Sequence, residues 1–170
     1  MNYKNRARFQ VFLILMLLSA VSVFGQDNYA FDKIPPALLE GANAVVRIGE
    51  SSWEIVSRGE AKRREKLVVT ILNESGEDDY DQLYVFYDKF TKVSDIEGIL
   101  YDSNGKVLKK LRNSNIEDYG YGGAGNDILD GRVKVASFGK KAYSYPYTIE
   151  YTYEIKERNM MFYPKWRPTS

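Results

Sequence analysis

Residues 143–157, YSYPYTIEYTYEIKE, constrain the fold more than any other stretch, because apolar and polar side chains alternate along them with a period of two. The apolar set comprises Tyr143, Tyr145, Tyr147, Ile149, Tyr151, Tyr153 and Ile155. Successive side chains of a β-strand point to opposite faces, whereas a helix would scatter these residues around its axis. The stretch therefore predicts one long strand with an apolar and a polar face.

Other segments carry the same strand signals and are separated by turn residues. Residues 44–56 and 66–72 alternate on either side of the turn sequence SRGE at 57–60, which predicts a long hairpin. Residues 92–111 contain the turn sequence Asp-Ser-Asn-Gly at 102–105, and Asn-Gly is a strong hairpin signal because both residues tolerate positive φ. Short strands separated by turn signals predict an all-β fold, and we expect an antiparallel β-sandwich with long hairpins.

Two segments before residue 82 differ from this pattern. Residues 33–45 contain two prolines and end their leucine-bearing turn at Gly41, which predicts one turn of helix at the entrance of the domain. Residues 73–81, NESGEDDYD, predict a solvated acidic loop. The carboxylates in this loop could bind a hard cation, but they lack the glycine and glutamate of an EF-hand register. No stretch after Ala44 shows a helical period.

The tyrosine-rich face of residues 143–157 has two interpretations. Aromatic rings with polar tips could form a platform for stacking sugars, but such a stripe is more often core, and we expect it to be core. Pro146 lacks a backbone N–H and predicts an edge position at the start of this strand. The basic run AKRREK, residues 61–66, likewise predicts a solvated sheet edge, where cations discourage aggregation.

The N-terminus has the three parts of a secretory signal peptide. A basic stretch at residues 4–8 precedes the apolar run of residues 11–21, and small residues lead to Gly25. An uncleaved anchor is the alternative, although the run is shorter than the roughly 20 apolar residues that span a bilayer. We expect cleavage after Gly25, which divides the chain into a signal peptide, residues 1–25, and one β-sandwich domain, residues 26–170.

Composition limits the location, partners and chemistry of the chain. Export to the periplasm or the cell exterior permits disulfides, yet there is no cysteine, so packing must supply stability. The net charge of +1 is far from the strongly basic charge of nucleic-acid-binding domains, so we expect no nucleic-acid partner. Beyond the signal peptide we expect no membrane contact. With no histidine or cysteine, the usual general base, the thiol nucleophile and the commonest zinc ligands are missing. We therefore expect that the chain is not an enzyme and has no catalytic, cofactor-binding or metal-binding residue. Composition alone still permits glycoside hydrolysis by a pair of carboxyl groups.

Residues 122–131, GGAGNDILDG, match two ligand-binding patterns. They fit the calcium-binding nonapeptide of parallel β-rolls, and residues 120–125, GYGGAG, fit the glycine fingerprint of dinucleotide-binding folds. The fingerprint requires a following helix, whereas the residues after it are strand-like. Calcium β-rolls need about three or more repeats, and one copy would offer Asp127, Asp130 and backbone carbonyls, fewer than the 6 to 8 oxygens that Ca²⁺ takes. A flexible connection is the simpler interpretation, and calcium binding by this loop stays an open question.

Several fragments, read in order, resemble one known family. They are KIPPALLEGANAVVR, KLVVTILNESGEDD, VSDIEGILYDSNGKVLKKL, NIEDYG, LDGRVKVASF and YPYTIEYTYEIK. This set is similar to the domain of unknown function 3857 family, a β-rich domain that precedes transglutaminase-like (papain-fold) domains in secreted bacterial proteins, and it covers most of residues 31–165. The resemblance implies a non-catalytic β-sandwich followed by a transglutaminase-like domain in the same polypeptide. It also implies that the sandwich is incomplete at its C-terminus, since relatives continue beyond Ser170.

The expected function follows from this resemblance and from the missing chemistry. We expect a non-catalytic structural or interaction module of a secreted or periplasmic transglutaminase-like protein. The alternative is a periplasmic module that binds carbohydrate or peptide, with the tyrosines and the glycine loop as its site. An enzyme that uses paired carboxylates is a third possibility, for which no pair is singled out.

Overall fold

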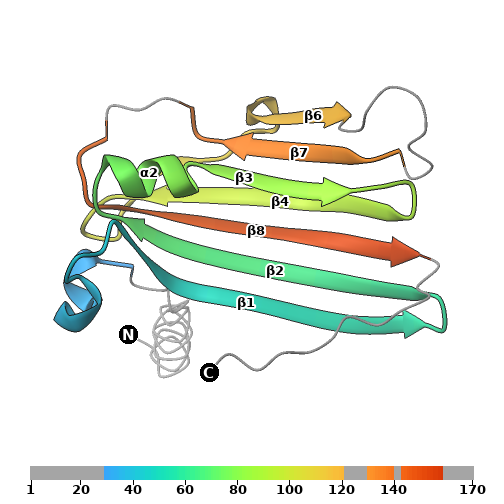
Figure 1. Ribbon diagram of the computed structural model, residues 1–170, viewed down its shortest axis with the longest axis horizontal. Coiled ribbons are helices and arrows are strands. Elements are labelled where there is room, and N and C mark those ends of the chain that lie inside the picture. The colour runs from blue at the N-terminus through green and yellow to red at the C-terminus, as the bar shows by residue number, and fades with distance from the viewer. Residues whose placement is uncertain (1–28, 121–129, 140–142, 159–170) are drawn as a thin grey trace, which may run out of the picture.

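The computed structural model describes residues 29–120, 130–139 and 143–158, and within them the chain forms a two-layer antiparallel β-sandwich (Figure 1). This confirms the predicted fold class. The predicted signal peptide, most of the glycine loop and the residues after Arg158 lie outside the described part. The strands are β1 (Ala44–Ser57), β2 (Glu60–Ile71), β3 (Gln82–Tyr87), β4 (Thr91–Tyr101), β5 (Val107–Lys110), β6 (Ile116–Gly120), β7 (Arg132–Ser137) and β8 (Tyr147–Arg158).

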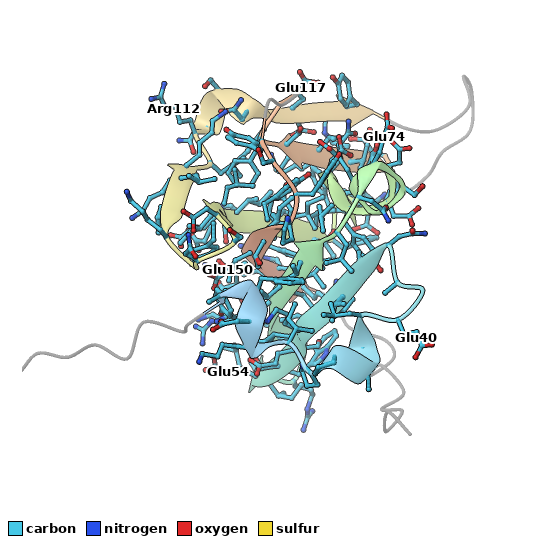
Figure 2. The ribbon with its side chains drawn as sticks, turned by 90° about the vertical axis from the view of Figure 1, so that its left-hand side faces the viewer. Glu40, Glu54, Glu74, Arg112, Glu117 and Glu150 are labelled. Carbon is cyan, nitrogen blue, oxygen red and sulfur yellow. The ribbon has the colours of Figure 1, made fainter. Side chains whose placement is uncertain are left out.

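The two layers differ in size. One sheet has five strands in the order β1-β2-β8-β4-β5, and the other has three in the order β3-β7-β6. Figures 1 and 2 both show the three-stranded sheet on one side of the molecule and β1 on the other. Three strands therefore face five, and much of β1 has no opposing strand among the described residues.

The main core lies between the layers and contains the predicted tyrosine stripe. Tyr147, Ile149, Tyr151 and Ile155 of β8 are only 1–2% exposed, which confirms that the stripe is core. Tyr143 and Tyr153 pack against this core while partly buried. Other buried members come from β2, β3, β4 and β7 and from the residue that follows β7, and they are Val69, Ile71, Leu83, Val85, Val93, Leu100, Ala136 and Phe138.

A second, smaller cluster covers the opposite face of the five-stranded sheet. Tyr29 packs edge-on against Tyr101 with ring centroids 5.2 Å apart, and Val68 lies buried beside them. On the same face the hydroxyls of Thr70 and Thr148 form a buried hydrogen bond of 2.8 Å. Both faces of β8 are thus partly covered, which its sequence alternation did not indicate.

The predicted helical entrance and hairpins are confirmed. Two short 3-10 helices, Phe31–Lys33 and Pro36–Leu38, precede β1, and Gly41 follows with a φ of +68°. β1 and β2 pair along their length as one hairpin.

The turn between β4 and β5 is held mainly by Asp102. Its carboxylate accepts hydrogen bonds from the backbone N–H groups of Asn104 and Lys106, both at 2.9 Å. Gly105 is the turn residue with positive φ, at +79°, whereas Asn104 keeps negative φ. The hairpin is as predicted, although its turn uses one left-handed residue rather than two.

The prediction of a loop at residues 73–81 is wrong, because α2 (Glu74–Tyr80) is a helix. The Asn73 side chain caps it by accepting a hydrogen bond from the N–H of Gly76 at 3.1 Å. Glu74 and Glu77 occupy its first turn, where negative charge favours the helix dipole.

Two predicted sheet edges are also wrong. Residues 61–66 belong to β2, which pairs with β1 on one side and β8 on the other. Pro146 precedes β8 through a cis peptide bond, and β8 itself lies between β2 and β4. The missing N–H of Pro146 therefore falls outside the ladder and indicates nothing about the position of the strand.

Candidate functional site

An aromatic surface covers the outer side of the three-stranded sheet. Tyr84, Phe86 and Tyr119 are 54%, 57% and 50% exposed, although large apolar side chains normally favour the interior. Phe86 pairs across strands with Val133, which pairs in turn with Tyr119, so one row crosses all three strands. We call the exposed Tyr84, Phe86 and Tyr119, together with the buried Val133 and the half-buried Val135 that lie between them, the aromatic face. Such a contiguous surface is typical of an interaction site.

The sequence of β3 explains how this face arises. Leu83 and Val85 point into the core, and Tyr84 and Phe86 therefore point outward, because side chains alternate along a strand. Glu117 of β6 lies on the outer side with Tyr119 and accepts a hydrogen bond from its hydroxyl. Figure 2 shows Glu117 at the end of the molecule away from Glu54 of β1.

A charged network lies on the inner side of the same sheet and ties its three strands together. The carboxylate of Asp118 on β6 accepts hydrogen bonds from Lys134 at 2.8 Å, from Arg132 at 2.9 Å and from the hydroxyl of Tyr87 at 2.6 Å. These donors, Lys134 first, lower the pKa of Asp118 to about 2. The network fixes β3, β7 and β6 to one another and so supports the aromatic face.

A polar groove of about 750 Å³ lies on the five-stranded sheet. The cross-strand ion pair between Arg64 and Glu154, at 3.0 Å, forms part of its floor. A second cross-strand ion pair, between Lys66 and Glu150 at 3.1 Å, lies just beside the groove. The hydrogen bond from Arg64 is the main reason that the pKa of Glu154 is lowered. The lining residues are Glu50, Ser51, Ser52, Arg64, Glu65, Lys66, Asp95, Glu97, Thr152, Tyr153 and Glu154.

The tyrosines do not form the alternative sugar-stacking site. Burial places Tyr147 and Tyr151 inside the sandwich and raises the pKa of both phenols. Tyr143 and Tyr153 are partly buried against the same core, and Tyr145 is the one exposed ring of the five. It is 39% exposed and donates a hydrogen bond to Glu77 of α2, which raises its pKa to about 12. One exposed ring next to a short helix is not a platform, so this part of the alternative is wrong.

The groups that sequence patterns singled out for metal chemistry stay apart or undescribed. Within residues 29–120, 130–139 and 143–158, no group of three or more acidic residues is placed to hold a metal ion, and this includes the acidic segment at α2. The glycine loop lies outside the described residues except for Asp130, whose φ is +52°, and Gly131. The described residues contain no helix that is long and apolar enough to cross a membrane.

The aromatic face was not among the sequence predictions. Apart from Gln82 at its start, β3 is apolar in both alternating sets, so the pattern QLYVFY does not tell which set lies inside. Two of the outward residues are aromatic, and this is the one signal that could have marked the strand as two-faced.

The fold and these surfaces define a β-sandwich that displays aromatic side chains outside its core. The chain belongs to the family described as "Domain of Unknown Function with solved-structure structure (DUF3857)", whose model matches residues 57–168. The match begins at the last residue of β1. The resemblance inferred from the sequence is confirmed for the family, while the transglutaminase-like context stays a prediction.

A solved crystal structure is similar to most of this chain. The crystal structure is that of a "putative protease" from Parabacteroides distasonis, with a TM-score of 0.58 and 14% sequence identity. The similarity covers 71% of this chain and 24% of that one, so this chain matches about a quarter of the other protein. At this identity the likeness shows a shared fold. A search of curated proteins found no match.

Proposed function

We propose that this chain is a non-catalytic interaction module of an exported protein, and that its aromatic face packs against a companion domain in the same polypeptide. The companion that we expect is transglutaminase-like, as the family resemblance implies. The exposure of Tyr84, Phe86 and Tyr119 on three adjacent strands is the observation that carries the proposal. Aromatic anchors of this kind dominate the energetics of interfaces.

Two further observations support a companion in the same chain. The similar crystal structure contains this fold as 24% of a longer polypeptide, so such a sandwich occurs beside other structural units. The missing histidine and cysteine fit a module that leaves chemistry to another domain. The signal peptide predicted at residues 1–25 supports export. Mass spectrometry of the mature protein would test this by locating its first residue.

The test compares this chain with the longer gene product by hydrogen exchange and light scattering. We expect the isolated chain to self-associate through its aromatic face and the longer protein to be monodisperse, with slower exchange in β3 and β6. The double variant Tyr84→Ser/Phe86→Ser should reduce self-association of the isolated chain by about 10-fold or more, since buried aromatic anchors often contribute 2 kcal/mol or more.

Matched control substitutions remove exposed apolar side chains elsewhere. Leu38 and Leu108 are 55% and 45% exposed and lie outside the aromatic face, so Leu38→Ser/Leu108→Ser should leave association unchanged. A monomeric isolated chain, or equal exchange of β3 and β6 in the two proteins, would refute the proposal. A gene product that ends at Ser170 would refute the part that places the companion in the same polypeptide.

A further inference from the structure

Strand β1 forms one border of the five-stranded sheet and leaves one edge unpaired among the described residues. It pairs only with β2 there. The stretch Glu50–Ser57 is exposed at every residue. Register shifts occur at Val46/Ile48 and at Ile55/Ser57, and the eight residues between them keep regular pairing. An edge of this kind presents a row of backbone N–H and C=O groups to a further strand.

The two faces of this stretch have opposite character. Trp53 and Ile55 lie opposite Arg63 and Ala61, on the face that carries the main core further along the sheet, and are 37% and 52% exposed. The guanidinium of Arg63 lies 5.4 Å from the centre of the Trp53 ring and holds the ring in place. This face therefore offers two apolar contacts to an added strand.

The other face of the stretch is acidic. Glu50 and Glu54 lie on it and form no ion pair with any described residue. Glu50 also lines the polar groove, whose lining contains five acidic and two basic residues. The acidic lining residues are Glu50, Glu65, Asp95, Glu97 and Glu154, and the basic ones are Arg64 and Lys66. Lys66 and Lys62 of β2 lie directly opposite Glu50 and Glu54 on this face, and Lys66 forms its ion pair with Glu150. The two glutamates are the charges on the edge strand itself, next to which the side chains of an added strand would lie.

We propose that β1 is a β-augmentation site for an extended segment in which apolar and basic residues alternate. The backbone of that segment would continue the ladder, its apolar side chains would lie beside Trp53 and Ile55, and its basic side chains would lie beside Glu50 and Glu54. Glu50 and Glu54 are four residues apart, about 13 Å in a strand, which equals the spacing of basic residues at i and i+4 in the added segment. This site uses a different surface from the aromatic face.

Charge argues against a second copy of this chain as the occupant. Antiparallel pairing of two β1 strands with matching faces, centred on this stretch, brings Glu50 or Glu54 of one copy opposite or diagonal to an acidic residue of the other. Like charges in such positions destabilise a pair of strands, whereas lysine or arginine in the same positions stabilises it. The edge also has no lysine and no proline of its own, the residues that most often discourage pairing.

The test is hydrogen exchange of the full chain with capped nine-residue peptides as probes. One peptide alternates valine and lysine, and a matched peptide alternates valine and glutamate. We expect the lysine peptide to slow exchange in residues 50–57 and to bind more weakly as salt rises, and the glutamate peptide to have no effect. Glu50→Lys/Glu54→Lys should weaken the lysine peptide by about tenfold or more and should make the glutamate peptide the preferred one.

The control variant Glu40→Lys/Asp78→Lys makes the same change in net charge at exposed positions outside this stretch and should keep the original preference. Unchanged exchange in β2 and β8 would show that each variant is folded. Equal protection by both peptides, no protection by either, or an unaltered preference in Glu50→Lys/Glu54→Lys would overturn the proposal. Protection of residues 50–57 through dimerisation without peptide would also overturn it and would identify a second copy as the occupant.

Discussion

Substituting Gly76 with alanine would test how closely helix α2 is seated on the sandwich. Gly76 is buried, and a Cβ atom there would lie 2.1 Å from the backbone oxygen of Asn43, 2.7 Å from its carbonyl carbon and 3.2 Å from the Cβ of Ala44. The same backbone oxygen of Asn43 accepts a hydrogen bond from the N–H of Leu72 at 2.9 Å. The side chains of Asn43 and Asn73 form a further hydrogen bond of 2.9 Å. The obstacle is therefore a held segment rather than the tip of a side chain.

The expected destabilisation comes from two opposing effects. Alanine favours a helix interior over glycine by about 1 kcal/mol. The new Cβ atom and the backbone of Asn43 would have to move apart by about 1 Å to reach normal contact, and such overpacking costs about 1–3 kcal/mol. It also weakens hydrogen bonds at Asn43 that each contribute about 1 kcal/mol. We expect a net loss of about 2–4 kcal/mol in the free energy of unfolding, which lowers the Tm by roughly 5–15 °C.

Urea denaturation followed by circular dichroism would measure this difference. Gly59→Ala is the matched control, because a Cβ atom at Gly59 would have no neighbour within 4 Å and its φ is not positive. That variant should stay within about 0.5 kcal/mol of the parent protein. If Gly76→Ala were as stable as the parent, or more stable, helix propensity would dominate and the close contact with Asn43 would be refuted.

Two further substitutions test the hydrogen bonds that join strands. The pKa of Asp118 is about 2 in the folded protein, below its usual 3.8, so the group stabilises the fold above about pH 4 and this contribution is lost as the pH falls towards 2. Asp118→Asn should therefore be less stable than the parent at pH 7, with a gap in Tm that narrows between pH 4 and 2; a constant gap would contradict the network. Thr148→Val leaves the hydroxyl of buried Thr70 without its partner and should cost about 1–3 kcal/mol, whereas Thr70→Val/Thr148→Val should be closer to the parent in urea denaturation. If the double variant were less stable than Thr148→Val, the hydrogen bond between the two hydroxyls would stabilise the fold by more than the cost of leaving one hydroxyl without a partner.

The strands were predictable where one periodicity dominates the sequence. Residues 143–157 and the hairpin of β1 and β2 have a clear period of two, and turn residues mark their ends, so local information was sufficient. The position of each strand in its sheet was not predictable in this way. β2 has a cation-rich half, yet it is internal because carboxylates of β8 pair with Arg64 and Lys66 from the neighbouring strand. That partner is distant in sequence, and local reasoning could not identify it.

Helix α2 was missed because it is too short for periodicity to show. Its seven residues make about two turns, and five of the nine residues in NESGEDDYD are acidic, which suggested solvation. The available signal was Asn73, a favoured N-cap residue, followed by Glu74 and Glu77 in the first turn. Capping residues therefore indicated this helix better than its hydrophobic pattern did.

The two proposed surfaces follow from one property of the sandwich, the unequal size of its layers. In a sheet that is covered on both faces, most apolar side chains are buried. Single exposed apolar side chains are common on any protein surface, whereas a group of them is not. Here Tyr84, Phe86 and Tyr119 are exposed on the outer face of the smaller layer. Trp53, Ile55 and Val56 are exposed on the part of β1 that the smaller layer does not reach. Because the figures show these regions on opposite sides of the molecule, one partner on each could bind at the same time. Substitutions in the aromatic face should then leave peptide binding at β1 unchanged, and the effects of the two sets on stability should add.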